Sequence, residues 1–375
     1  MKNHVLPVSF LIMTGLAVSC INERPNLSGH IEMDRDTLLI EVSSVLGQYK
    51  GYIDTVVLRN GYFETSIPDS ASFVYFVPKP KSESEMITMC PTRILFLPGD
   101  RMTVSGSVNA PEISGTELYD ALNLQTEMKA AERAWMEKLQ QMHGLYTFDN
   151  RNAAAIDSLR KEVRTAVKRL DETRLELVGK EPANIASAYA AIFLPEEESI
   201  EAYGMLDESI RNSAIAPVLD YFISYNRNVI QKKQNWKSLQ PGVQAPDFRL
   251  KNLEGEYMTL DSFKGKYLLL DFWGTWCGWC IKGIPDLKKY YEKYKDRVEF
   301  ASIDCRDTEE EWREGVAEHE LTWTNLFNGD GQEVTLAYGI QAYPTMIIID
   351  PEGKVVGAYV GENPALYEKL DELFR

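Results

Sequence analysis

Histidine and basic side chains are scarce in this chain. Its 375 residues include four histidines, scattered from His4 to His319, and 56 acidic against 40 basic residues give a formal net charge of −16. Nucleic-acid binding depends on Lys and Arg that neutralise phosphates, so this balance argues against a DNA- or RNA-binding protein. The scattered histidines also disfavour a His-rich metal site and a Ser-His-Asp hydrolase. We therefore expect no nucleic-acid partner and no metal.

Cysteine is sparse as well, and odd in number. The five cysteines are Cys20, Cys90, Cys277, Cys280 and Cys305. This low density excludes a small scaffold held together by disulfides. The remaining composition, with 44% hydrophobic and 26% charged residues, is typical of a globular protein, and the length is sufficient for two or three domains.

No apolar run is long enough to span a bilayer as a helix, which takes about 20 residues. Residues 5–18 are almost wholly apolar, follow the basic Lys2 and have the length of the apolar part of a signal peptide. They lead into Leu16-Ala17-Val18-Ser19-Cys20, which resembles a bacterial lipobox, although the leucine lies four residues before the cysteine rather than three. We predict a signal peptide over residues 1–19, acylation of Cys20 and a lipid-anchored tether over residues 20–26. Cleavage without acylation, and thus plain secretion, is the alternative.

Three regions of different periodicity follow. Residues 27–112 contain short runs rich in β-branched and aromatic residues, with Asn60-Gly61 as a hairpin turn, and predict an all-β, sandwich-like domain. Residues 115–237 have apolar residues at helical spacing and predict a helical region, with helices over 117–143 and 152–178 that end near Gly144 and Gly179. Residues 240–375 predict an α/β domain, in which one mixed sheet has helices on both faces. Its expected elements are strand 267–273, helix 278–294, strand 298–303, helix 308–318, strands 345–350 and 355–360, and helix 364–374.

Two cysteines lie where the strand over 267–273 passes into the next helix, as Cys277-Gly278-Trp279-Cys280. The positive end of the helix dipole and the free N–H groups there stabilise a thiolate, which is the nucleophilic form of cysteine. We therefore predict that Cys277 is reactive and that Cys280, one turn inside the helix, is its buried resolving partner. A zinc site lacks a second ligand pair, and haem attachment would need histidine where Ile281 stands. A purely structural disulfide remains the alternative, and no cofactor is expected.

Residues 240–375 resemble a thioredoxin-fold thiol-disulfide oxidoreductase of the TlpA/ResA-like kind. The matching features are the entry segment 241–248, Phe263-Lys264-Gly265-Lys266, the motif over 271–280, Pro285, Tyr343-Pro344-Thr345 and the hairpin turn over 350–354. The resemblance implies a redox-active Cys277–Cys280 disulfide and a cis peptide bond before Pro344. It also implies substrate binding by Trp276, Trp279, Tyr343 and Pro344. Residues 27–112 resemble the β-rich domain of unknown function that precedes thioredoxin modules in envelope lipoproteins.

The chain lacks the motif of a peroxidatic cysteine, and it also departs from the ResA-like pattern. Leu270 and Gly274 stand where a peroxidatic site would carry Pro and Thr, which disfavours a peroxiredoxin. ResA-like members carry a glutamate three residues after the second cysteine, where this chain has Gly283. Conversely, Asp271 occupies the place of the buried acid of thioredoxins. Because its strand is apolar throughout, we expect Asp271 to be buried with a raised pKa and to take the proton of Cys280.

The resemblance implies an enzyme of the cell envelope of a Gram-negative-type bacterium, with its thioredoxin domain in the periplasm. It would reduce disulfides of protein substrates with electrons from a membrane thiol transporter, and its lipid anchor would be its only contact with the membrane. A disulfide oxidase or isomerase is one alternative, since Cys-x-x-Cys proteins span a wide range of reduction potentials. The other is a binding lipoprotein whose thioredoxin module only docks a partner. Cys90 and Cys305 are predicted to be dispensable.

Overall fold

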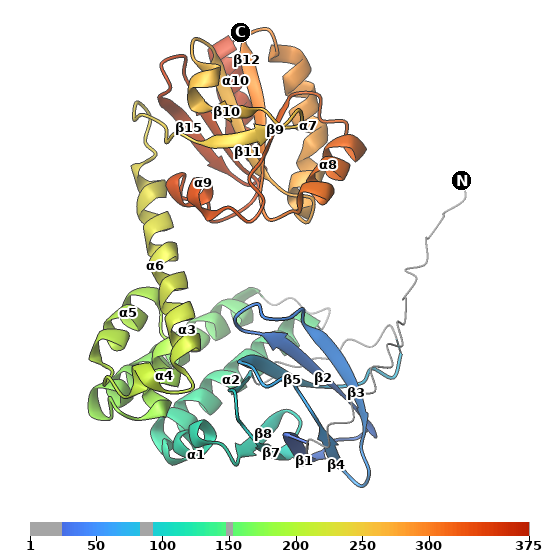
Figure 1. The fold of residues 1–375 in the computed structure, drawn as a ribbon, viewed down its shortest axis with the longest axis vertical. Coiled ribbons are helices and arrows are strands. Elements are labelled where there is room, and N and C mark those ends of the chain that lie inside the picture. Colours follow the sequence, from blue (N-terminus) through green and yellow to red (C-terminus); the bar gives the residue numbers. More distant parts are fainter. Residues whose placement is uncertain (1–24, 83–92, 148–152, 375) are drawn as a thin grey trace. The chain divides into compact units, whose positions relative to one another are not determined.

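The computed structural model describes residues 25–82, 93–147 and 153–374 (Figure 1). The predicted signal peptide, Cys20 and Cys90 lie outside these residues. Contacts between elements divide the chain into two units, one made of residues up to 173 with 213–218, the other of residues 174–212 with 219–375. In the part of the chain that is described, no helix combines the length and apolar character needed to cross a bilayer.

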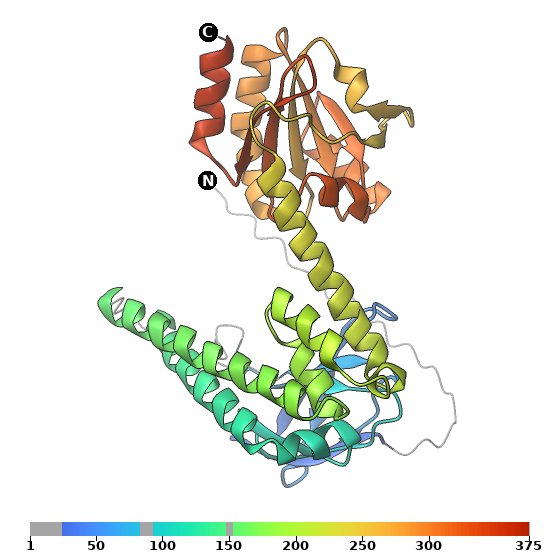
Figure 2. The same cartoon turned by 90° about the vertical axis from the view of Figure 1, so that its left-hand side faces the viewer.

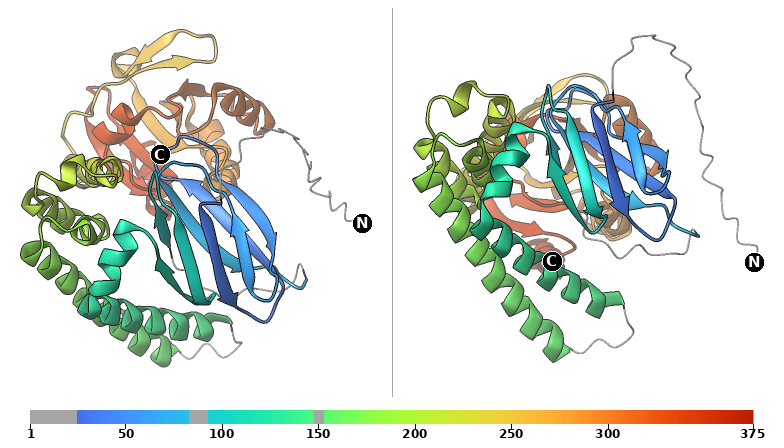
Figure 3. Two further views of the ribbon diagram at one scale, coloured as in Figure 1. Left: turned by 60° about the horizontal axis from the view of Figure 1, so that its bottom comes forward. Right: turned by 90° about the horizontal axis from the view of Figure 1, so that it is seen from below.

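The first unit contains two four-stranded sheets with buried inner faces (Figure 3). Phe63 of one sheet and Phe76 of the other place their ring centroids 5.9 Å apart, so the two inner faces meet in one core. This arrangement confirms the expected all-β, sandwich-like region. In spatial order, the sheets are β4 (Tyr62–Thr65), β1 (Leu27–Glu32), β7 (Met102–Ser107) and β8 (Ala110–Ser114), and β3 (Tyr52–Val57), β2 (Thr37–Ser44), β5 (Ser72–Pro78) and β6 (Ile94–Phe96).

The turn at Asn60-Gly61 is as tight as the sequence predicts. Asn60 and Gly61 have φ of 53° and 80°, and the backbones of Arg59 and Tyr62 exchange hydrogen bonds of 2.9 and 3.0 Å. Positive φ at both central positions is the requirement of a type I′ turn. The flanking strands β3 and β4 nevertheless belong to different sheets, so this turn carries the chain from one sheet to the other.

Helices follow the sheets, as expected, but their ends differ from the prediction. The helix expected over 117–143 is divided at Gln125, and Gly144 lies inside its helix rather than at the end, whereas the helix that contains Gly179 ends one residue later, as expected. Glycine costs about 1 kcal/mol in a helix interior, which a helix of 22 residues tolerates. The helices are α1 (Glu117–Leu124), α2 (Thr126–Thr147), α3 (Ala153–Lys180), α4 (Ile185–Ile192), α5 (Glu196–Met205), the short η1 (Ile210–Asn212) and α6 (Ala216–Ser238).

The C-terminal region is built on a seven-stranded mixed sheet with helices on both faces, the expected thioredoxin-like α/β fold. In spatial order its strands are β10 (Tyr257–Thr259), β9 (Arg249–Asn252), β13 (Thr324–Phe327), β12 (Val298–Asp304), β11 (Tyr267–Trp273), β14 (Thr345–Ile349) and β15 (Val355–Val360). Its helices are α7 (Gly278–Tyr294), α8 (Glu309–Glu318), α9 (Gln332–Ala337), α10 (Pro364–Phe374) and the short η2 (Leu260–Phe263).

Strand β11 lies inside the sheet, parallel to β12 and antiparallel to β14. Its side chains alternate between two cores, as those of a strand must. Leu269 and Trp273 belong to the core that α7, α8 and α10 cover, while Leu268, Leu270 and Phe272 belong to the core on the other face. By this alternation Asp271 is on the side of α7 and α10. Figure 2 shows these two helices side by side, and the rings of Tyr290 and Tyr367 stack between them at 4.4 Å.

The end of α6 packs on α9 and on the opposite core of this sheet. Asn235 Nδ2 donates to the carbonyl of Leu336 at 2.7 Å, and Trp236 packs against the core. Gly339, with φ of 63°, lies so close to α6 that a Cβ there would be 2.5 Å from the Lys232 carbonyl oxygen. The C-terminal half of α6 is therefore built into the thioredoxin-like unit.

Candidate active site

The two cysteines of the motif lie at the start of α7, directly after β11. Cys277 is the N-cap residue of the helix, and its Sγ accepts the backbone N–H of Cys280 at 3.1 Å. A disulfide joins the two residues, whose Cα atoms are 5.2 Å apart. The sulfur of Cys277 thus lies among the N–H groups at the positive end of the helix, which stabilises a thiolate once the disulfide is reduced.

The two cysteines are about equally buried in this oxidised state. Cys277 is 4% and Cys280 5% exposed. Cys280 is buried as expected, but Cys277 is equally covered. The difference in their expected roles therefore depends on position, because only Cys277 caps the helix.

The loop before Cys277 is anchored on the segment that follows β12. Thr275 donates to the carboxylate of Asp307 from its backbone N–H at 2.7 Å and from its hydroxyl at 2.8 Å. Trp276 Nε1 donates to the Cys305 carbonyl at 2.8 Å, and a Cβ at Gly274 would lie 2.8 Å from the same oxygen. Sequence reasoning missed the role of Asp307. The polar run after β12 was its signal, because the carboxyl ends of the parallel strands β11 and β12 meet at one edge of the sheet.

Aromatic side chains surround the disulfide, as the family resemblance implied. Trp276 is 45% and Trp279 65% exposed. The ring of Trp276 meets that of Tyr343 edge-on at 5.2 Å, and the Arg306 guanidinium lies 5.0 Å from the former ring and 5.2 Å from the latter. Lys282 lies 4.9 Å from the ring of Trp279. Two cations, neither of them predicted, therefore stack on the aromatic surface beside the cysteines.

The bond between Tyr343 and Pro344 is cis, as the resemblance implied. Pro344 and Cys280 line one small cavity, which brings the proline loop next to the disulfide. The structure thus brings together Cys277, Cys280, Trp276, Tyr343 and Pro344, while Trp279 projects from the first turn of α7.

Asp271 is buried, with 7% of its surface exposed. Ser302, its partner on β12, donates to Oδ2 at 3.0 Å, and Ser302 in turn accepts from Trp323 Nε1 at 2.8 Å. Oδ1 has no hydrogen-bond partner among the described residues. Burial, against the hydrogen bond from Ser302 and with a smaller contribution from the charge of Glu362, raises the pKa of Asp271 to about 7. A carboxyl group with such a pKa can both accept and donate a proton near neutral pH.

Asp271 and Cys280 share the walls of the same small cavity. Gly283 and Pro344 also line it, and the space for the centre of a water molecule is about 10 Å³. This is close to the least volume that holds one water. The acid and the second cysteine therefore face the same small cavity.

The other acids and the third described cysteine near the site fit no direct role in exchange. Burial raises the pKa of the Cys305 thiol to about 12, so this residue stays protonated and unreactive at neutral pH. Burial and the neighbouring Asp307 raise the pKa of Asp304 to about 9. Among the described residues, no three His, Cys, Asp or Glu side chains converge as a metal site would require.

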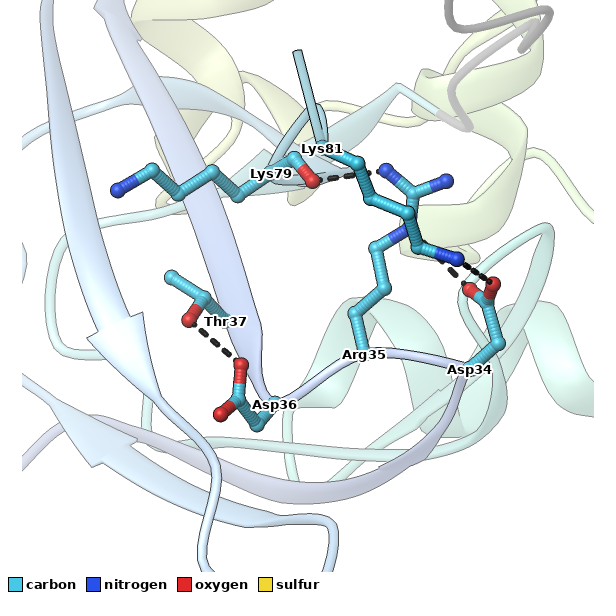
Figure 4. Close-up of polar contacts among 6 residues, drawn as sticks. All are labelled: Asp34, Arg35, Asp36, Thr37, Lys79 and Lys81. Carbon is cyan, nitrogen blue, oxygen red and sulfur yellow. Dashed lines mark hydrogen bonds and ion pairs between the residues drawn. The ribbon is translucent and has the colours of Figure 1, made fainter.

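A larger hollow of about 720 Å³ lies in the first unit, between residues 33–37 and 79–81 (Figure 4). Its charged side chains bind one another: Asp34 pairs with Lys81 at 3.1 Å, and Arg35 donates to the Lys79 carbonyl at 2.7 Å. Hydrogen bonds from Lys81 and Arg35 lower the pKa of Asp34. Its described lining residues include no Cys, Ser or His, so we assign the hollow no chemistry.

Comparison with known proteins identifies relatives of the C-terminal region. The AhpC/TSA family matches residues 241–358. The thiol-disulfide oxidoreductase ResA of Bacillus thuringiensis is 34% identical over 140 residues, which are 37% of this chain and 79% of that protein. The thioredoxin-like protein YneN of Bacillus subtilis is 33% identical over 138 residues, which are 36% of this chain and 80% of that protein.

Among solved structures, the thioredoxin domain of a thiol-disulfide oxidoreductase from Bacteroides vulgatus is similar. It is 33% identical, covers 37% of this chain and 100% of that domain, and has a TM-score of 0.35.

Proposed function

Because this chain belongs to the ResA-like thiol-disulfide oxidoreductases of the thioredoxin fold, we propose that it reduces disulfides of proteins in a bacterial cell envelope. One observation carries the proposal: in the cysteine pair at the start of α7, Cys280 shares a cavity with the buried acid Asp271. The pair supplies two electrons, and the acid handles the proton that the second cysteine must lose.

In the first step, the Cys277 thiolate of the reduced enzyme attacks one sulfur of a substrate disulfide. A bond forms between that sulfur and Cys277, the substrate S–S bond breaks, and the other substrate sulfur leaves as a thiolate. The N-cap position of Cys277 favours its attack, because the helix N-terminus stabilises its thiolate. Trp276, Trp279 and Tyr343 bind the substrate segment around its cysteine.

In the second step, Cys280 passes its proton to Asp271 and attacks Cys277. The enzyme disulfide forms as the mixed disulfide breaks, and the second substrate sulfur leaves as a thiolate. The substrate has then gained two electrons and the enzyme has lost two. Since the pKa of Asp271 is raised to about 7, its carboxylate is a stronger base than an ordinary aspartate.

The enzyme must regain two electrons after each cycle. The bacterial periplasm is kept oxidising, so a reductant there needs electrons from another compartment. A membrane thiol transporter fits this need, and acylated Cys20 would hold the enzyme at the membrane surface of a Gram-negative-type envelope. The signal-like segment before Cys20 and the lipobox-like residues support this location.

Redox equilibration of the full chain with reduced and oxidised glutathione tests the direction of exchange. The fraction of reduced Cys277 is measured by alkylation and mass spectrometry at each ratio, with Cys280→Ser as a control that cannot form the pair. We expect a potential near the value of thioredoxin, about −270 mV. A value near that of DsbA, about −120 mV, would contradict a reductant and favour a disulfide oxidase.

A further inference from the structure

Gly283, in the second turn of α7, has a carboxylate where its side chain would be. A Cβ built on Gly283 would overlap Oε1 of Glu362, which lies in the segment between β15 and α10. Glu362 is an exposed residue, and yet one of its oxygens reaches the helix backbone at this point. Any side chain at position 283 would displace this carboxylate. The Glu362 carboxylate therefore fills the space that the missing side chain of Gly283 leaves, although the two residues are 79 positions apart in the sequence.

This arrangement lies on the wall of the cavity that holds Asp271 and Cys280. Gly283 is one of the residues that line the cavity, so the carboxylate of Glu362 lies just behind that wall. Glu362 is also the charged group that acts on Asp271 through space. A negative charge close to a buried carboxyl group disfavours its ionised form.

We propose that Glu362 sets the pH at which Cys280 becomes able to release substrate, by holding its carboxylate over Gly283 beside Asp271. The inference rests on the proposed function, because it takes Asp271 as the proton acceptor of Cys280. Glu362 itself does not need to touch either sulfur. It acts through Asp271, whose affinity for a proton it increases.

Glu362 carries a charge more readily than the buried Asp271. Asp286 and Lys282 face it from α7, Tyr367 from α10 and Asp271 from β11. Burial and the charge of Asp286 raise the pKa of Glu362, and Lys282 lowers it. Because the residue is also open to solvent, its charge is far less costly than that of the buried Asp271.

The test measures the ionisation of Asp271 directly, by carboxyl ¹³C NMR over pH 4–9, in the reduced full-length protein. Glu362→Gln keeps the shape of the side chain and removes its charge. We expect the midpoint of Asp271 to fall by about half a pH unit, because solvent screens most of the effect of an exposed charge. Glu368→Gln is the matched control, because it removes an exposed glutamate from the helix that follows, α10, and we expect it to leave the midpoint unchanged.

A second variant, Gly283→Ala, should displace the carboxylate of Glu362 without changing Glu362 itself. In Gly283→Ala the new methyl group pushes away the flexible end of the Glu362 side chain, and alanine is a better helix former than glycine. The midpoint of Asp271 should again fall, although Glu362 is still present. In the double variant Gly283→Ala/Glu362→Gln the two shifts should not add, because both remove the same charge from the same place.

Release of substrate from the mixed disulfide must follow the same shifts. We expect the inflection of the release rate against pH to move to lower pH in both single variants, by the amount found for Asp271. An unchanged midpoint in Glu362→Gln, or an inflection that does not follow the midpoint, would overturn the role of Glu362. If no variant or wild-type protein forms a mixed disulfide at all, the proposed function itself fails, and with it the role in release.

Discussion

Asp271 shows how one residue can lower stability and serve the site at the same time. Its carboxyl group is buried, and one of its oxygens has no partner among the described residues. The other oxygen accepts a hydrogen bond from the hydroxyl of Ser302, which offsets only part of the cost of burial. A buried carboxyl group with so few partners costs stability, so a purely structural role does not explain it. The raised pKa is the physical consequence of this burial, and it is also what makes the group useful for proton transfer.

The first prediction concerns the stability of Asp271→Asn. An aspartate has a pKa of about 3.8 when exposed and about 7 here, so the folded protein holds its proton over a range where the unfolded chain has lost it. Stability linked to this group is therefore fully present below pH 4 and declines up to pH 7. We expect Asp271→Asn to be more stable than the wild type above pH 7, by at most about 4 kcal/mol, and to gain little near pH 4. Urea unfolding at pH 4.5 and 8 measures both gains, and equal gains would contradict the burial argument.

The second prediction concerns the kinetics of the same variant. First attack by Cys277 should change little, because Cys277 receives its stabilisation from the helix terminus. Release by Cys280 should slow most below about pH 7, where solvent produces few thiolates without the help of a base. Rapid mixing with a model disulfide separates the two steps. Unchanged release over pH 5–8 would make solvent, and not Asp271, the proton acceptor.

At the scale of the element, the long and strongly patterned segments were predictable from the sequence. Strand 267–273, helix 278–294 and helix 364–374 agree with β11, α7 and α10 residue for residue. The missed elements β9, β10, β13 and α9 have three to six residues, too few to show a period. They owe their structure to pairing partners in the sheet and to contacts with the core.

Prediction of the active site from the sequence was also limited to features that are local in the sequence. The cysteine pair, Asp271 and the proline loop are local motifs, so sequence reasoning could identify them as candidates. Arg306 and Glu362 could not be found in this way, because each becomes relevant only when a distant segment folds next to it. The expected end of a helix at Gly144 was wrong because glycine is only a local signal for a helix end. The helix α2 continues through Gly144 to Thr147.

The third prediction tests the packing of α6 on the thioredoxin-like unit. Gly339→Ala combines a positive φ of 63° with a clash against the backbone of Lys232 and Trp236. Gly255→Ala is the matched control, because its φ is 82° and nothing lies within 4 Å. Both variants should lose about 1–2 kcal/mol from the strained φ, and Gly339→Ala about 1–3 kcal/mol more from overpacking.

Urea unfolding followed by tryptophan fluorescence reports on this unit, because six of the seven tryptophans lie in it. Equal losses in Gly339→Ala and Gly255→Ala would show that α6 does not press on this loop. A larger loss in Gly339→Ala would show that the helix is part of the stable unit that carries the site.

At the scale of the whole molecule, the chain combines a redox unit with a first unit to whose described residues we assign no chemistry. A net charge of −16 gives this molecule little attraction to anionic lipid surfaces. Membrane attachment would therefore depend on the lipid at Cys20.

The fourth prediction concerns that attachment. We expect the mature protein to begin with an acylated Cys20, and we expect Cys20→Ser to leave the membrane fraction. Mass spectrometry of the native N-terminal peptide shows both the first residue and its modification. A different first residue, or an unmodified Cys20, would contradict the anchor while leaving the redox chemistry untouched.

The central claim is that Cys277 attacks substrate and Cys280 resolves the mixed disulfide, and trapping in cells tests it most directly. Cys280→Ser should accumulate mixed disulfides with substrate proteins, visible as high-mass species that disappear on reduction, because the attack still occurs and the release cannot. Cys277→Ser should accumulate none, and Cys305→Ser should behave as the wild type, because its buried thiol is protonated. Trapping by Cys277→Ser and not by Cys280→Ser would show that the roles of the two cysteines are reversed.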